Sequence, residues 1–299
     1  MKRTLTATLA SVLLAACGGG DGATSASSSQ SGAQTSPAAL KRTTPMGVLV
    51  PLYGYPLAAS GSGTSSTTVE SPAWTTVAAD AAAVPTVAVI NPSNGPVACT
   101  TPASATLSAF QQGIARLQAA GVTVLGYVLT GYGQRDPALL KQDVQRYAQC
   151  YGVDGVFFDE VSDQASRASY YATAASAVRQ LIVPASGKPA LVAINPGTYP
   201  DSAIADTADI TVMHESADLD LPAIPSSLSA YAPGKFAYLA LGRSDLPQVQ
   251  AATLSSLFRQ GIGYAYLTDL GEGNDPWAAL SSSYPALIQT LKTLNQTLN

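Results

Sequence analysis

From residue 47 onward, short apolar runs alternate with segments of helical pattern. Eight runs rich in Val, Ile, Leu, Ala and aromatic residues are typical of buried strands: 47–55, 86–91, 122–130, 153–160, 190–195, 209–215, 235–241 and 262–268. Nearly continuous apolar runs, rather than strict alternation, indicate parallel strands covered on both faces. The pattern therefore predicts an α/β fold.

Apolar residues recur at helical spacing between several of these runs. Helices are predicted over 104–120, 136–149, 163–183 and 247–259. Eight strand–helix units in about 245 residues match the size and order of a single-domain (β/α)8 TIM barrel. An open, doubly wound sheet is the alternative, but a Ser/Gly-rich loop at 60–68 stands where a Gly-rich phosphate motif would be. No nucleotide or other cofactor is implied.

The N-terminal residues have the pattern of a targeting segment. Lys2 and Arg3 precede a short apolar run that ends in Leu14-Ala15-Ala16-Cys17. This ending resembles a bacterial lipobox, which implies lipidation of Cys17; an ordinary secretory signal is the alternative. We therefore expect a lipoprotein signal peptide at 1–16 and localisation to the bacterial cell envelope, lipid-anchored in the outer membrane, or secretion.

The next segment, 17–44, is rich in Gly, Ser and Ala and has almost no large apolar residue. Such a composition predicts a flexible tether, since it cannot bury enough surface to fold. The barrel domain is then expected to occupy 45–299. Membrane contact is expected only through the N-terminal anchor, and the protein is expected to be a monomer.

Charge is sparse and slightly acidic, with 11% charged residues and a net charge of −4, which becomes −6 when Lys2 and Arg3 are removed. Nucleic acid is excluded as a partner because binding it needs a basic face. An acidic protein favours a cationic ligand. The remaining cysteines, Cys99 and Cys150, are open to disulfide formation, although a barrel topology places them near opposite ends. No metal site is expected from these cysteines and a single His.

Polar residues gather where the apolar runs stop, and in a TIM barrel those carboxyl ends form the active site. Asp159 and Glu160 end the fourth run, and His214 and Glu215 end the sixth. The other candidates, expected to contact substrate, are Tyr53, Tyr55, Asn91, Tyr127, Tyr132, Asn195 and Asp269. Tyrosine rings pack on the C–H faces of sugars, while amides and carboxylates bind the hydroxyls.

Glycoside hydrolysis needs two carboxyl groups on either side of the bond that breaks. Asp159 and Glu215, on the fourth and sixth strands, meet that need. Structural alternatives remain open for each candidate. One of Asp159 and Glu160 is expected to cap the helix that follows near Ser162, since neighbouring strand residues point opposite ways. Glu215 has the alternative of capping a helix over 216–227.

The other candidates have structural alternatives too. The lone histidine, His214, is expected to be structural. The two asparagines stand before prolines and are open to a turn role, the tyrosines to barrel filling, and Asp269 to a loop role. A serine hydrolase is disfavoured because the GxSxG motif does not occur in the folded part.

Several motifs together resemble the spherulation-specific family 4 (spherulin-4-like) proteins. They are Gly47-Val48-Leu49-Val50-Pro51-Leu52-Tyr53-Gly54-Tyr55-Pro56, Val89-Ile90-Asn91-Pro92-Ser93-Asn94-Gly95-Pro96, the segment 120–135 with Gly126-Tyr127-Val128, Thr130, Tyr132 and Arg135, and Val153 to Glu160. The resemblance covers most of 47–270. It departs in the order Ser93-Asn94 and in Val97-Ala98-Cys99, which belong to the loop expected to line the cleft after the second strand.

This resemblance implies a TIM-barrel enzyme of glycoside hydrolase family 135, which cleaves α-1,4-linked N-acetylgalactosamine in exopolysaccharides such as those of biofilms. It implies Asp159 as nucleophile and Glu215 as acid/base, with Glu160 orienting its neighbours; whether Asp159 or Glu160 attacks stays open on the sequence. We therefore expect a retaining endo-acting glycosidase on a galactosamine or N-acetylgalactosamine polymer. The alternative is a non-catalytic carbohydrate-binding surface lipoprotein on the same barrel.

Overall fold

The computed structural model describes residues 42–61, 67–271 and 275–298. All of them belong to one compact unit, Ala39–Asn299. The expected signal peptide, Cys17 and almost all of the expected tether lie outside the described residues. Within the described part, no helix is long and apolar enough to cross a bilayer.

Eight parallel strands close into a barrel in the order β1-β10-β9-β8-β7-β6-β5-β4. The strands are β1 (Gly47–Pro51), β4 (Thr86–Ile90), β5 (Thr123–Leu129), β6 (Gly155–Asp159), β7 (Leu191–Ile194), β8 (Ile210–Ser216), β9 (Phe236–Ala240) and β10 (Tyr264–Leu267). They are almost entirely buried, as their continuous apolar sequences predict. The predicted TIM barrel is confirmed.

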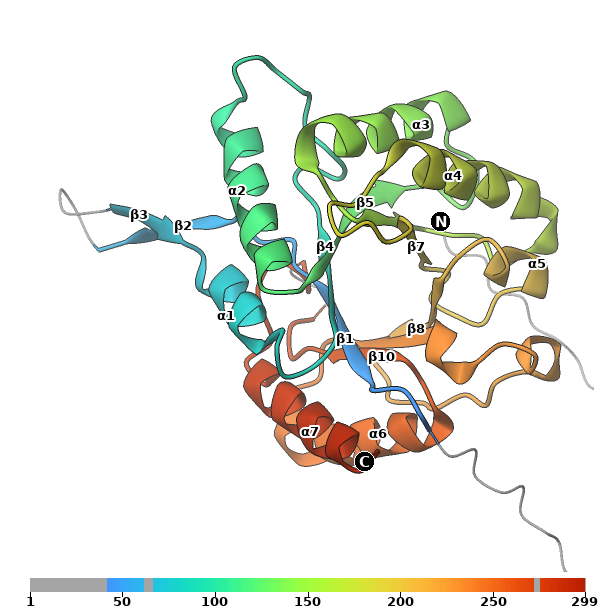
Figure 1. Cartoon of the computed structure of the whole chain (residues 1–299). Coiled ribbons are helices and arrows are strands. Elements are labelled where there is room, and N and C mark those ends of the chain that lie inside the picture. The colour runs from blue at the N-terminus through green and yellow to red at the C-terminus, as the bar shows by residue number, and fades with distance from the viewer. Residues whose placement is uncertain (1–41, 62–66, 272–274, 299) are drawn as a thin grey trace, which may run out of the picture. The chain divides into compact units, whose positions relative to one another are not determined.

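Helices lie outside the ring of strands (Figure 1). They are α1 (Pro72–Asp80), α2 (Ala105–Ala119), α3 (Pro137–Arg146), α4 (Ala168–Leu181), α5 (Ser202–Ala205), α6 (Leu246–Gln260) and α7 (Tyr284–Gln296). A π-helical turn, Tyr147–Tyr151, continues α3, and short 3-10 turns occupy Ala165–Arg167, Ser226–Leu228 and Pro233–Lys235. Ser104 and Asp136 cap α2 and α3 as predicted, each accepting a hydrogen bond from the first turn.

One close approach requires glycine at the start of β6. A Cβ on Gly155 would lie 1.9 Å from the carbonyl oxygen of Leu191 on β7. No side chain fits at that distance, so the absence of a side chain at Gly155 lets β6 and β7 pair closely. The two strands then carry Asp159 and Asn195 to the same end of the barrel.

Part of the loop predicted at 60–68 belongs to an antiparallel hairpin. Its strands are β2 (Leu57–Ser60) and β3 (Thr67–Glu70), and Figure 1 shows it projecting away from the barrel. Small and hydroxylated residues with almost no large apolar side chain hide its strands from a hydrophobicity pattern.

The helix suggested over 216–227 is wrong. Only the 3-10 turn at its end forms, and it follows Pro225. Upstream, the Ser216 hydroxyl and the Asp218 carboxylate accept hydrogen bonds from the backbone N–H groups of Asp218 and Asp220. These local bonds offer the backbone an alternative to a helix. Glu215 therefore caps no helix and lies within β8.

The expected separation of Cys99 and Cys150 is also wrong, because the two form a disulfide with their Cα atoms 6.0 Å apart. The loop after β4 runs beside the end of α3, where the Tyr151 hydroxyl accepts a hydrogen bond from the Val97 N–H at 2.9 Å. The π-helical turn carries Cys150 toward α2, where its carbonyl accepts a hydrogen bond from Gln111. The prediction assumed that the loop after β4 stays at the carboxyl end of the barrel, and this assumption is wrong.

Candidate active site at the carboxyl end of the barrel

Two carboxylates from different strands converge on one amide. Asp159 is the last residue of β6, Glu215 lies near the end of β8, and Asn195 directly follows β7, the strand between them. The Asn195 Nδ2 group donates to Asp159 Oδ1 at 2.8 Å and also to Glu215 Oε2. Two acceptors on one nitrogen can be at most about 6 Å apart, which places the carboxylates as close neighbours.

The second oxygen of Asp159 is held by a tyrosine. The Tyr127 hydroxyl, on β5, donates to Asp159 Oδ2 at 2.9 Å. Burial raises the pKa of Tyr127 above its ordinary value, and the negative charge of Asp159 raises it further. Tyr127 therefore keeps its proton and remains a donor, so Asp159 is fixed from both sides.

Glu160 lies next to this pair in an unusual backbone conformation. Its φ angle is +49°, in the left-handed region that residues other than glycine rarely adopt. The strand alternation therefore ends at Asp159. The charge of Glu160 contributes to the raised pKa of Tyr127, so its carboxylate lies near the same hydroxyl. Glu160 therefore lies at the same end of the barrel as Asp159 and Tyr127.

The expectation that Asp159 or Glu160 caps the following helix is wrong. The first turn after β6 begins at Ala165 with Gln164 as its N-cap residue, and α4 begins at Ala168. Instead, the backbone carbonyl groups of Asp159 and Glu160 accept hydrogen bonds from the Thr130 hydroxyl, at 2.9 and 2.7 Å. The Tyr132 N–H also donates to the Glu160 carbonyl, at 2.6 Å. These bonds stabilise the left-handed turn.

Glu215 is preceded by an irregularity in its strand. The register between β8 and β9 shifts between Val212 and His214, leaving an extra residue on β8 just before the acid. A bulge changes the direction of the side chains beyond it, and bulges of this kind occur next to active sites. His214 stacks on Tyr238 with ring centroids 4.3 Å apart and is buried, so its expected structural role is consistent with its contacts.

Tyr53 is placed beside the acids by the segment after β1. Its ring meets Tyr127 edge to face, with centroids 5.6 Å apart. Burial raises the pKa of Tyr53 well above its ordinary value, and the charges of Asp159, Glu215 and Asp275 add to the rise. Asp275, in the loop after β10, was not among the candidates from the sequence. It lies in a Gly-rich stretch and does not end an apolar run, which was the signal that indicated the other acids.

The other expected contacts lie away from the acids or are used locally. Tyr55 packs edge to face on Phe110 of α2, with ring centroids 5.8 Å apart, and the Asn91 side chain accepts a bond from the Gly95 N–H. Tyr132 is 56% exposed on the loop after β5, the most accessible aromatic ring among these candidates. Asn195 stands out because it contacts both acids rather than solvent.

Asp269 has a structural role in this arrangement. Both of its oxygens accept hydrogen bonds from Ser281 and Ser282, just before α7. Burial raises its pKa, but these hydrogen bonds outweigh that effect and leave the pKa below its usual value. Asp269 therefore anchors the segment that leads into α7.

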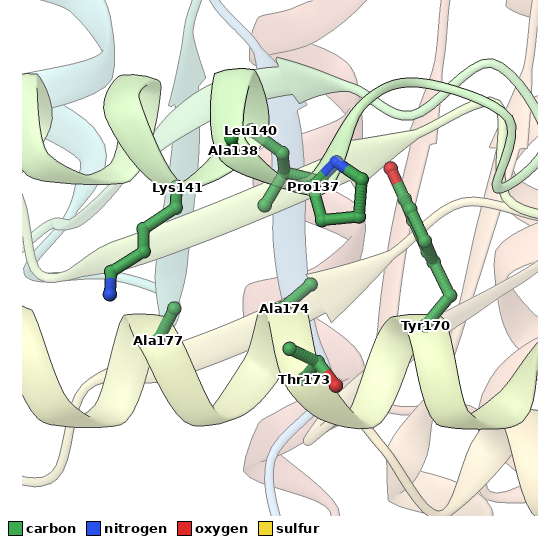
Figure 2. A pocket seen from close by; sticks show the side chains of 8 residues that line it. All are labelled: Pro137, Ala138, Leu140, Lys141, Tyr170, Thr173, Ala174 and Ala177. Carbon is green, nitrogen blue, oxygen red and sulfur yellow. The ribbon is translucent and has the colours of Figure 1, made fainter.

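A separate apolar pocket lies on the outside of the barrel, between α3 and α4 (Figure 2). It encloses about 210 Å³ and is lined by Pro137, Ala138, Leu140, Lys141, Tyr170, Thr173, Ala174 and Ala177. None of the acids lines it, so it is not the candidate active site. Among the described residues, no group of three or more His, Cys, Asp and Glu side chains is arranged to hold a metal ion.

Comparison with known proteins finds similarity along almost the whole barrel. A sequence profile of the family described as spherulation-specific family 4 matches residues 47–291. Spherulin-4 of Physarum polycephalum is 29% identical over 261 residues, which cover 84% of this chain and 71% of that protein. The structure is similar to the crystal structure of Aspergillus clavatus Sph3 in complex with GalNAc, with a TM-score of 0.64 and 21% identity over 83% of this chain and 98% of that one.

Proposed function

The chain belongs to spherulation-specific family 4, and on this basis we propose that it is a retaining, endo-acting glycosidase. Its substrate is an exopolysaccharide that contains α-1,4-linked galactosamine or N-acetylgalactosamine. The similarity to Sph3, which was solved in complex with GalNAc, supports an amino-sugar ligand. The observation that carries the proposal is the shared contact of Asp159 and Glu215 with the Asn195 amide.

The spacing of the acids supports retention of configuration. Retaining enzymes hold their two carboxyl groups about 5–5.5 Å apart, whereas inverting enzymes need about 6.5–9.5 Å to admit a water molecule. Two oxygens bound to one nitrogen are separated by at most about 6 Å. This limit on the nearest oxygens is compatible with a retaining pair, in which one carboxylate attacks directly.

Each acid has a distinct task in this reaction. Asp159 attacks the anomeric carbon while Glu215 donates a proton to the departing glycosidic oxygen. Glu215 then takes a proton from water, which attacks the same carbon and releases Asp159. The contacts of Tyr127 and Asn195 with both oxygens of Asp159 support its assignment as the nucleophile. Glu160 adds negative charge beside the developing positive charge of the sugar ring.

The acid cluster favours a positively charged sugar residue electrostatically. Asp159, Glu160 and Glu215 lie together, and Asp275 lies close enough to raise the pKa of Tyr53. A free galactosamine residue carries an ammonium group that these charges attract. N-acetylgalactosamine is neutral and would rely on the aromatic and hydrogen-bonding groups.

Product analysis on both polymers tests this function. Purified protein is incubated with α-1,4-linked oligomers of N-acetylgalactosamine and of galactosamine, and released fragments are identified by mass spectrometry. The proposal requires shorter oligosaccharides from at least one polymer. Binding to both polymers with no cleavage of either supports the alternative, a non-catalytic carbohydrate-binding surface lipoprotein.

The proposed location is the bacterial cell envelope, through a lipid on Cys17, with the protein a monomer and the anchor its only membrane contact. The first described residue, Arg42, donates to the Ile262 carbonyl at 2.7 Å, just before β10. Arg42 therefore lies at the end of the barrel opposite the acids. Labelling with radioactive palmitate tests the anchor: wild-type protein should be labelled and Cys17→Ser should not.

A further inference from the structure

The Asn195 side chain is held in a single orientation by its surroundings. It is 6% exposed, and its Oδ1 atom accepts a hydrogen bond from the Gly197 N–H at 3.0 Å. If the amide were reversed, Oδ1 would face two carboxylate oxygens and the NH2 group would face an N–H donor. Both arrangements are unfavourable, so the NH2 group must face Asp159 and Glu215.

The backbone beneath this side chain is fixed as well. The Asn195 N–H donates to the Phe158 carbonyl at 2.9 Å, and the Asn195 carbonyl accepts from the Val161 N–H at 3.0 Å. Asn195 is therefore bound on both sides to the segment that carries Asp159 and Glu160. Through Gly197, whose carbonyl accepts from the Glu215 N–H at 3.3 Å, the same turn also reaches β8.

We propose that Asn195 is the positioning residue of this site, an inference that rests on the proposed glycosidase function. Its amide holds Asp159 and Glu215 at the separation that retention requires and stays bonded to whichever of them is negatively charged. This role differs from the substrate contact expected from its place at a strand end. Removing the amide takes away the donor that contacts both carboxyl groups.

The charge of the pair moves during the reaction, which explains why one donor serves both acids. Before attack, Asp159 is ionised and Glu215 carries a proton. Because Glu215 Oε2 accepts from Asn195, we assign the Glu215 proton to Oε1 in this proposal. When the Asp159–carbon bond forms and the glycosidic bond breaks, that proton passes to the leaving oxygen and Glu215 becomes the anion. Hydrolysis by water reverses both changes.

The pH profile separates positioning from substrate contact. A donor favours the ionised form of each carboxyl group it contacts, so Asn195→Ala should move both limbs of the kcat/KM profile to higher pH. The other groups facing the pair are Glu160, Tyr127, Tyr53 and Asp275. They are unchanged by the substitution.

The kinetic constants kcat and KM should also distinguish positioning from substrate contact. Asn195→Ala should lower kcat about 100-fold, because losing one preorganised donor has an effect of that size. KM should change little. Asn195→Asp, which keeps the side-chain shape but replaces the donor by an acceptor, should lower kcat at least as much. A raised KM with unchanged kcat and unmoved pH limbs overturns the proposal in favour of substrate contact.

The matched control is Asn295→Ala. Asn295 is also an amide held in a backbone network, bonded to the Met46 N–H and carbonyl, but at the opposite end of the barrel. It should lower stability and leave both pH limbs in place. A control variant that moves the limbs equally overturns the proposal, because the shift would then report a general structural effect.

Crystal structures of the wild type, Asn195→Ala and Asn195→Asp provide a readout that needs no activity. The proposal predicts that the Asp159 and Glu215 carboxyl groups separate in both variants because the donor that bridges them is gone. An unchanged separation overturns it. If the wild type cleaves neither polymer, the glycosidase function fails while this comparison still decides whether Asn195 sets the spacing.

Discussion

Asp159 has a hydrogen-bond donor at each carboxylate oxygen, Asn195 at Oδ1 and Tyr127 at Oδ2. In the proposed role of Asp159 as nucleophile, a carboxylate fixed in this way needs little reorganisation before it attacks, which lowers the entropic part of the activation free energy. The donors also come from different strands, β5 and the end of β7. The direction of attack is therefore set by the barrel and not by a mobile loop.

We predict that Tyr127→Phe lowers kcat about 10- to 100-fold and leaves the fold intact. The change removes one donor to the nucleophile without altering the ring that packs on Tyr53. Initial rates and urea unfolding measure the two effects. Tyr170→Phe is the matched control, since the Tyr170 hydroxyl bonds to the Arg135 carbonyl outside the acid cluster. Wild-type kcat in Tyr127→Phe would show that this bond has no role in catalysis.

At the scale of single residues, the sequence singled out two carboxyl groups that the fold brings together, but not the contacts around them. Asp159 and Glu215 stood out because charge is rare in this chain and both end apolar runs. The contacts of Asn195 were not predictable, because strand position does not say which atoms a side chain bonds. The left-handed turn at Glu160 depends on Thr130 and Tyr132, which approach only in the folded state.

Among the elements, the loop after β4 is tied to the end of α3 by Cys99–Cys150. The loop begins at Asn91, one of the residues at the carboxyl end of the barrel. The bond spans 51 residues of sequence, so it removes many conformations from the unfolded chain. It stabilises a segment that has no regular secondary structure before α2.

We predict that replacing both cysteines by serine lowers the free energy of unfolding by about 2–4 kcal/mol, since cross-links closing loops of this length have effects of that size. Urea unfolding of the double variant and of the wild type, without reductant, measures the difference. Adding dithiothreitol to the wild type should reproduce the loss. A change under about 0.5 kcal/mol would contradict the prediction.

The eight barrel strands were predictable, whereas the β2–β3 hairpin and the turns of 216–227 were not, for a physical reason. Buried parallel strands must be apolar throughout, so their positions are visible in the sequence. The hairpin β2–β3 is made largely of small or hydroxylated residues and carries no such signal. The segment 216–227 has no helix because local hydrogen bonds of Ser216 and Asp218 hold its backbone in turns.

For the molecule as a whole, charge is distributed along the barrel axis. α2, α3, α4 and α6 each carry an arginine in the last turn: Arg116, Arg146, Arg179 and Arg259. Helices of a (β/α)8 barrel run against the strands, so these arginines lie at the amino end, where they offset the helix dipoles. The acid cluster lies at the carboxyl end, which favours approach of a cationic polymer from that side.

Buried tyrosines make the folded state sensitive to alkaline pH. Burial raises the pKa of Tyr151, Tyr199 and Tyr266 to about 12. Below the ordinary tyrosine pKa of about 10, both the folded and unfolded states keep these protons and stability does not depend on them. Above it, the unfolded chain loses protons that the folded protein retains.

We therefore predict that the free energy of unfolding falls as pH rises from about 10 to about 12. Urea unfolding at several pH values measures the fall, and absorbance at the tyrosinate band reports ionisation in each state. Stability that stays constant while the folded protein ionises at the ordinary tyrosine pKa would contradict the prediction.

The stereochemistry of the first product tests the pairing of Asp159 and Glu215 most directly. Cleavage of an α-1,4-linked galactosamine or N-acetylgalactosamine oligomer is followed by ¹H NMR before the released sugar mutarotates. The account predicts that the α anomer appears first and that Asp159→Asn, with its fold intact, releases no product. A β anomer as the first product, or sustained turnover by Asp159→Asn, would contradict the assignment of Asp159 as nucleophile and Glu215 as acid/base.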